Sequence, residues 1–310
     1  MSWEYDGLFN AWTNSDEPSL LPPTITDTRI GRMGYRTRTT KAGARLEAEV
    51  FPVFTRQAAG KARAAKKAMT PAAQEKANHA RSIRRTILLA EENFTREDYF
   101  LTLTYRGAEP SYKRCKADVV NFLKRVKRER KRAGLEEQKS LYVIEGGEGR
   151  ERIHIHMLLS GGLSWETLHR IWDRGRNSSG GMIQAARLET QDGKIEGAVL
   201  YMAKQLWAKG YRKQTTAEDE VSGIAGYMAQ HPGSRRRWCP SKNLRQPKVR
   251  TSNTKVSNAR VKRIAYDFQS EARAVMEKIY PGYSFVRCSV YYSDVVDGVY
   301  IRCVMRRFGQ

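Results

Sequence analysis

The fold is decided by the stretch Ile153-His154-Ile155-His156-Met157-Leu158, an apolar run that carries two histidines one residue apart. Such a run predicts a buried β-strand, and the two-residue period of a strand points both imidazoles to the same face. Two imidazoles on one face can bind a divalent metal ion, whereas a single histidine is usually packed or hydrogen-bonded. On these residues alone, metal ligands and satisfied structural histidines both stay open.

A second apolar run lies just before the histidines and ends in a carboxylate. Residues 141–144 are followed by Glu145, by the glycine-rich turn 146–149 and by the cationic Arg152. This order predicts a β-hairpin in which Glu145 closes the first strand beside the histidines. A carboxylate and two imidazoles suit Mg²⁺ or Mn²⁺ acting on phosphate. Glu148 is the rival third ligand, and we prefer Glu145 because a strand end is held more firmly than a glycine turn.

A predicted helix follows the histidine strand and carries a tyrosine. Helical spacing places Leu200, Ala203 and Trp207 on a buried stripe. Tyr201 and Lys204 share another face, one turn apart. A tyrosine beside a lysine can attack a phosphate with help from the cation. Tyrosine and lysine are also common on helix surfaces, so the spacing by itself does not decide between the two interpretations.

In this order and spacing, the segments resemble the HUH endonucleases, specifically the rolling-circle replication initiators of phages and plasmids. Residues 100–105, whose alternation predicts a half-buried strand, match the first motif of that family. His154-Ile155-His156 matches its histidine-hydrophobe-histidine motif, and residues 201–204 match its tyrosine-lysine motif. Residues 235–244 are similar to an arginine-aromatic-Ser-Lys segment of phage-type members, and the resemblance covers residues 75–247.

The resemblance implies a fold, an activity and a role for each residue. The fold is α+β, an antiparallel sheet with flanking helices and an RRM- or ferredoxin-like core, in which the histidines lie on a central strand. Tyr201, assisted by Lys204, nicks single-stranded origin DNA and leaves a 5′-phosphotyrosine and a free 3′-hydroxyl primer. His154, His156 and Glu145 hold the divalent metal ion. The activity is that of a metal-dependent, site-specific endonuclease and strand transferase.

Two features depart from the family pattern. Position 205 is Gln, so the chain resembles the single-tyrosine members rather than those with two tyrosines one turn apart. Residues 226–230 repeat the tyrosine segment without its lysine, within an insertion expected at 208–232. Tyr227 therefore ranks below Tyr201 as the nucleophile, and a second role for it stays open.

The charge balance indicates a polyanionic partner. The chain has 56 Lys and Arg against 33 Asp and Glu, a formal net charge of +23 and a pI near 10.0. Many cations follow the apolar stripe of an amphipathic helix around Phe122, and others surround Trp238, whose ring we expect to stack on a base. The residues expected to contact DNA are Lys124, Lys127, Arg128, Lys131, Arg152, Arg235, Arg236, Arg237, Trp238 and Lys242.

The remaining segments are assigned by local signals. We expect a basic N-terminal arm at 1–43, the endonuclease domain at 44–247, and a C-terminal extension at 248–310 with a helix at 259–279 and a β-hairpin around Asp297-Gly298. A further strand is expected from residue 45, and helices from Pro71 and from Ser164.

Cellular context follows from what the sequence lacks. The four cysteines form no CxxC pair, and neither a secretory signal nor a membrane-spanning run is present, so we expect the cytoplasm of a bacterial host and no membrane partner. A GxxxxGK[ST] phosphate loop is absent, so a host helicase and a host polymerase are expected as separate partners.

Two alternative functions remain at this point. The first is a single-tyrosine transposase or relaxase with the same chemistry. The second is a non-catalytic, basic nucleic-acid-binding protein whose histidines are structural.

Overall fold

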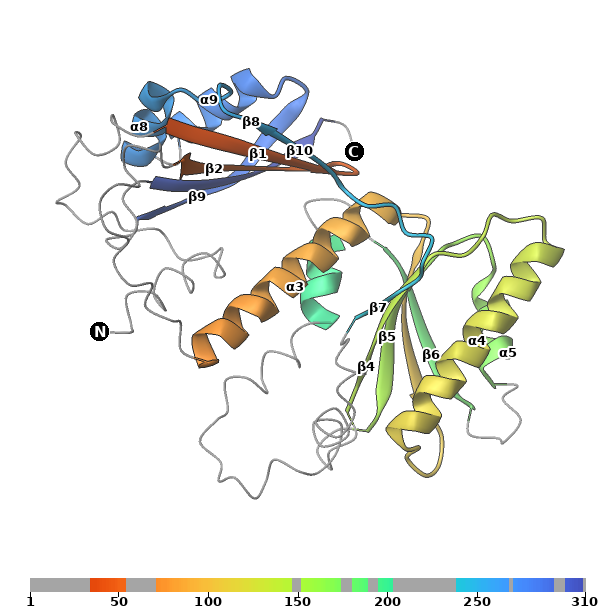
Figure 1. Ribbon diagram of the computed structural model, residues 1–310. Helices are drawn as coiled ribbons and strands as arrows, with labels where there is room; N and C mark the ends of the chain where they lie inside the picture. The colour runs from red at the N-terminus through yellow and green to blue at the C-terminus, as the bar shows by residue number, and fades with distance from the viewer. Residues whose placement is uncertain are drawn as a thin grey trace. The chain divides into compact units, whose positions relative to one another are not determined.

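The computed structural model describes residues 34–53, 71–146, 152–173, 180–188, 195–202, 238–267, 270–292 and 299–308. These residues fall into a first unit, within 1–88 and 246–310, and a second unit, within 89–245. Each unit has an antiparallel five-stranded sheet accompanied by helices (Figure 1), which confirms the predicted α+β class. None of the helices in these ranges is long and apolar enough to cross a membrane.

The second unit is built on a sheet whose central strand carries the histidines. Its strands run in the order β6-β3-β5-β4-β7, so β5 lies in the middle. α4 and α5 cover one face (Figure 1), and residues 195–202 are helical as well. The bounds are β3 (Tyr99–Tyr105), α4 (Tyr112–Arg132), β4 (Ser140–Glu145), β5 (His154–Leu159), α5 (Trp165–Asp173), β6 (Gly180–Arg187) and β7 (Cys239–Pro240).

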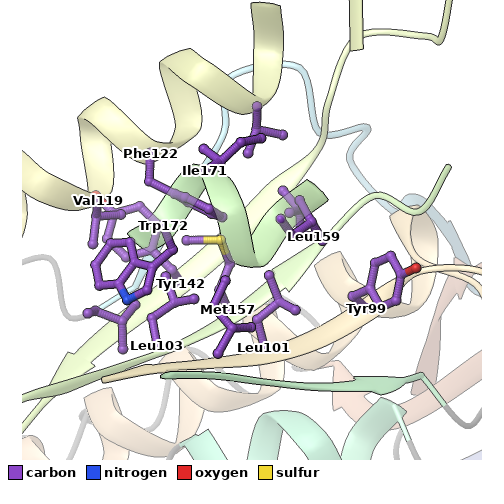
Figure 2. Packing of buried hydrophobic residues seen from close by; sticks show 14 of the residues in the cluster. Tyr99, Leu101, Leu103, Val119, Phe122, Tyr142, Met157, Leu159, Ile171 and Trp172 are labelled. Atoms are coloured by element: carbon purple, nitrogen blue, oxygen red, sulfur yellow. The ribbon is translucent and has the colours of Figure 1, made fainter. Parts of the chain in front are cut away.

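Apolar packing fixes which face of β5 the histidines occupy. Ile155 and Met157 are fully buried in the cluster that α4 and α5 form over the sheet, with Phe122 and Trp172 from those helices (Figure 2). Each such side chain contributes about 1.5 to 3 kcal/mol by leaving water. A slip of one residue would expose all of them, so the register is strongly specified. The histidines alternate with these residues and therefore point away from α4 and α5.

Most helices begin where the sequence predicts. α3 (Pro71–Asn93) starts at the expected proline, and the Ser164 hydroxyl accepts from the Thr167 amide before α5. The single helix predicted at 259–279 is instead two helices, α8 (Asn258–Tyr266) and α9 (Ser270–Ile279). Asp267 accounts for the break, because it ends α8 and its carboxylate accepts from the Ser270 amide at the start of α9.

The first unit combines N-terminal and C-terminal strands in the order β8-β1-β2-β10-β9. β1 and β2, which the sequence places on either side of the arm boundary at 43 and 44, form one hairpin there. The functional division into arm, domain and extension stays a prediction. The bounds are β1 (Gly34–Ala42), β2 (Arg45–Val53), β8 (Lys248–Ser252), β9 (Tyr283–Tyr292) and β10 (Val299–Arg307).

A buried ion network lies on one face of the first sheet, opposite the apolar cluster. Glu47 is fully buried and accepts from Arg45 at 2.8 Å, from Arg84 at 2.6 Å and from Arg302 at 3.2 Å. Burial by itself raises the pKa of Glu47, but the charges of the three arginines outweigh it and hold the pKa well below that of an ordinary Glu. The network therefore depends on an ionised Glu47.

We predict that Glu47→Gln destabilises the first unit by about 3 to 5 kcal/mol, because it leaves buried arginines uncompensated. The depressed pKa means that the stabilisation is present above the unfolded-state pKa near 4.5 and is lost as the pH falls below it. Thermal unfolding at pH 7 and at pH 3.5 measures both effects, and the gap between wild type and variant should narrow in acid. Glu271→Gln, which breaks the more exposed pair with Arg263, is the control and should cost far less.

Candidate metal and nucleophile site

The third ligand and the first histidine are brought together by the β4–β5 pairing. Glu145 is the last residue of β4 and lies directly opposite His154, while Val143 lies opposite His156. Residues that pair across an antiparallel ladder point to the same face, so Glu145 shares the face of both histidines. Gly146 turns the chain at a φ of 84°, a left-handed conformation that glycine adopts without strain. The predicted hairpin strands are thus confirmed, and Glu148 lies outside the described residues.

The three side chains form a compact, largely buried group. Glu145 Oε2 lies 3.6 Å from His154 Nε2 and 3.5 Å from His156 Nε2, and the three potential ligand atoms all lie within 4.8 Å of one another. Side-chain exposure is 2% for Glu145 and 4% for His156, against 17% for His154. The group therefore opens to solvent mainly on the His154 side.

Hydrogen bonds on the far side of each ring decide which nitrogen faces the carboxylate. His154 Nδ1 donates to the Arg152 carbonyl at 2.8 Å, because a carbonyl can only accept. The neutral ring therefore presents the Nε2 lone pair to Glu145. His156 Nδ1 is hydrogen-bonded to the Thr102 hydroxyl at 3.0 Å. Burial, and then the neighbouring His154, lower the pKa of His156 to about 4, so that its ring is neutral at pH 7.

This arrangement fits a divalent cation. Separations of 3.5 and 3.6 Å are too long for good hydrogen bonds. They match two ligand atoms that each lie about 2.1 Å from one ion, which are separated by about 3 to 3.5 Å. A buried carboxylate facing a neutral imidazole lone pair is also electrostatically unfavourable unless a cation lies between them. The Nδ1 contacts of both rings are those that orient metal-binding histidines in proteins. The residues can hold one ion, whose identity they leave open.

Tyr201 lies beside this group on the helical segment 195–202. Its ring centroid is 5.2 Å from that of His156, in an edge-on arrangement, and the side chain is 56% exposed. The buried side chains of the segment are Ile195, Val199 and Met202. The predicted buried stripe is therefore wrong at Leu200, which is 45% exposed. Apolar side chains stand on more than one face of this helix, and packing selected the stripe that leaves Tyr201 accessible.

Sequence reasoning assigned no role to two β3 residues that contact the site. Thr102 lies opposite His156 in the ladder and contacts its ring nitrogen. Phe100 stacks on His156 with ring centroids 5.5 Å apart, and its ring meets Tyr201 edge-on at 6.1 Å. The alternation of β3 indicated that Phe100 and Thr102 share a face. Only the β3–β5 register shows that this is the face of the histidines.

The residues expected to contact DNA do not form one surface. Lys124, Lys127, Arg128 and Lys131 are exposed on α4, which covers the sheet face opposite the histidines. Arg152 is exposed beside the site and donates to the Gly107 carbonyl, and Lys242 is exposed after β7.

One of these expectations is wrong, and four calls on catalysis and DNA contact cannot be placed. Trp238 is only 8% exposed, so its ring packs in the interior rather than presenting a face to a base. Lys204, Arg235, Arg236 and Arg237 lie outside the described residues, as does Tyr227.

The comparisons with known proteins concern this same region. Residues 98–232 match a family model of replication-associated proteins, the ORF2 type. The match begins just before β3 and includes Glu145, both histidines and Tyr201, and it supports a role as a replication initiator that acts on DNA. No curated protein and no solved structure matches the chain.

We predict that Gly146→Ala lowers the affinity for Mn²⁺ at least tenfold although no ligand is removed. A Cβ at this position would collide with the Arg152 carbonyl, the same oxygen that accepts from His154, and the left-handed φ would add strain. Isothermal titration calorimetry measures the affinity. Gly134→Ala is the matched control, because Gly134 also has a positive φ but a Cβ there meets nothing within 4 Å. Equal losses in both variants would mean that the turn does not position the ligands.

Proposed function

We propose that this chain is a rolling-circle replication initiator of the HUH type, which nicks origin DNA through Tyr201. The observation that carries the proposal is the position of the accessible Tyr201 ring against His156, within one group with Glu145 and His154. The family match over residues 98–232 supports the replication role independently of this geometry.

The proposed reaction is a phosphoryl transfer to a tyrosine. Tyr201 Oη bonds to phosphorus, the bond from phosphorus to the 3′ oxygen breaks, and that oxygen takes up a proton. Phenol hydroxyls are mostly protonated at neutral pH, so the Oη proton must leave during attack. We assign Lys204, one residue beyond the described helix, to offset the developing negative charge. The product is a 5′-phosphotyrosine and a free 3′-hydroxyl.

Glu145, His154 and His156 prepare the site for this reaction. A divalent ion such as Mg²⁺ or Mn²⁺ held by them would supply Lewis acidity at the scissile phosphate. Thr102 and the Arg152 carbonyl hold the two rings, and Phe100 limits the positions open to His156 and Tyr201. Such a pre-organised group avoids the cost of reorientation during the reaction.

The partners follow from the products. A free 3′-hydroxyl primes synthesis by a host polymerase, and a host helicase would separate the strands ahead of it. The phosphotyrosine conserves the energy of the broken bond, so a later strand can be rejoined without ATP. These partners and the bacterial cytoplasm belong to the proposal.

Two alternative functions make different predictions. A single-tyrosine transposase or relaxase would form the same adduct but on the ends of a mobile element or at a transfer origin. A non-catalytic binding protein would form no adduct on any DNA. Covalent capture on origin DNA therefore separates all three.

We predict that Tyr201→Phe abolishes the covalent protein–DNA adduct while the fold and Mn²⁺ binding persist. The change removes one oxygen from a half-exposed side chain, so little packing is lost. A denaturing gel with end-labelled single-stranded origin DNA displays the adduct as a shifted band. Tyr227→Phe is the internal control and should retain the adduct. An adduct that survives in Tyr201→Phe and disappears in Tyr227→Phe would place the nucleophile in the second segment.

The basic face of α4 has a separate part in the proposal. Arg130 on this helix is buried and donates to the carbonyls of Gly161 and Glu136, which is a structural role. Lys127 pairs with Glu137 at 2.5 Å. Lys124, Arg128 and Lys131 remain exposed, without an ion pair within the described residues. Since α4 and the metal group lie on opposite faces of one sheet, we assign α4 to duplex DNA beside the nick and not to the reacting strand.

We predict that Lys124→Gln, Arg128→Gln and Lys131→Gln, combined in one variant, weaken binding to duplexes of any sequence. The slope of log K against log salt should flatten by about 0.9 for each lost phosphate contact. Fluorescence anisotropy over a salt series measures it, and the charge-conserving variant with Arg at 124 and Lys at 128 serves as control. Cleavage of a short single-stranded origin oligonucleotide should be unchanged. A loss of that cleavage would mean that α4 contacts the reacting strand.

A further inference from the structure

A cluster of cations lies on the first unit, outside the proposed nicking site. β8 pairs with β1 so that Lys248 lies directly opposite Lys41, and Arg250 lies opposite Thr39. Lys41, Lys248 and Arg250 are all exposed. The two-residue period of the strands places all three side chains on the same face of the sheet.

Two tyrosines hold further cations against the same face. The Thr39 hydroxyl lies 2.6 Å from the Tyr280 hydroxyl, and Lys255 Nζ lies 4.5 Å from the centroid of the Tyr280 ring. Lys41 Nζ lies 5.3 Å from the centroid of the Tyr283 ring. These contacts direct the ammonium groups of Lys41 and Lys255 toward the edge where β8 lies. Lys41, Lys248, Arg250 and Lys255 are called the β8 cluster below.

The β8 cluster is electrostatically unfavourable in the protein alone. Like charges directly opposite in an antiparallel ladder destabilise the sheet. Burial, and then the charges of Lys41 and Arg250, lower the pKa of Lys255. Across the described residues, none of these four cations forms an ion pair with a carboxylate. Folding thus assembles a concentrated positive charge that a bound polyanion would compensate.

We propose that the β8 cluster is a second nucleic-acid contact, which binds the phosphate backbone of duplex DNA without reading its sequence. Tyr280 and Tyr283 are only 4% and 6% exposed, so their rings cannot stack on bases, and only the cations are accessible. The identity of the polyanion as DNA rests on the proposed function, whereas the demand for phosphate rests on the cluster itself. A backbone contact on this unit would hold the chain on DNA independently of the nicking site.

The first test is the salt dependence of binding by the full chain to a 30-base-pair duplex of unrelated sequence. The variant combines Lys248→Gln and Arg250→Gln, which should flatten the salt slope by about 1.8 for two phosphate contacts. The matched control combines Arg273→Gln and Lys278→Gln, two exposed cations of α9 in the same unit, and removes the same net charge. The control should keep the wild-type slope. Equal slopes in variant and control would overturn the proposal.

The second test asks whether the cluster costs stability, as a binding site does and a structural feature does not. Lys248→Gln relieves the repulsion with Lys41, so the melting temperature without DNA should rise by about 1 to 3 °C. A fall in the melting temperature would mean that Lys248 is structural, which contradicts the proposal.

Nicking of a short single-stranded origin oligonucleotide separates this proposal from the proposed function. The variant with Lys248→Gln and Arg250→Gln should nick such an oligonucleotide at the wild-type rate. If wild type forms no adduct but the variant still loses salt slope, the nicking proposal fails and the β8 cluster stands. If wild type nicks and the variant keeps its salt slope, the β8 cluster fails alone.

Discussion

The register between β4 and β5 is the constraint on which the candidate site depends. It sets Glu145 opposite His154, and the alternation along β5 adds His156 on the same face. The register is enforced from the other side of the sheet, where Ile155 and Met157 are buried under α4 and α5. The apolar core thus fixes three polar groups that repel or ignore one another without a cation. The protein spends packing energy to hold an arrangement that only a bound ion would make favourable.

Much of the site could be predicted because it is local in sequence. A hairpin joins Glu145 to the histidines, so strand alternation and a glycine turn are enough to place them together. The contacts from Phe100 and Thr102 were not predictable in this way, because they depend on a strand pairing between residues more than fifty positions apart. The helix of Tyr201 shows a second limit. Its apolar residues offer more than one buried stripe, and only packing against the sheet selects Val199 over Leu200.

The fold at larger scale was predicted in class but not in connection. Alternation and caps predicted most strands and helices, yet no local signal indicates that β1 and β2 complete a sheet with strands from the C-terminal end. Trp238 illustrates the same limit for binding residues. A tryptophan among arginines is typical of a stacking platform, but this one is buried, since composition does not determine which side of an edge strand faces the core. The positive charge is likewise distributed over α4 and over the β8 cluster, which no single run of sequence would show.

The central claim is that Glu145, His154 and His156 hold one divalent ion beside Tyr201. Anomalous diffraction from a crystal of the chain grown with Mn²⁺ tests it most directly. The account predicts a single strong peak within about 2.0 to 2.3 Å of a carboxylate oxygen of Glu145 and of both Nε2 atoms, on the face of the sheet that carries Tyr201. A peak elsewhere, or no peak at saturating Mn²⁺ with the three side chains in the same positions, would contradict it.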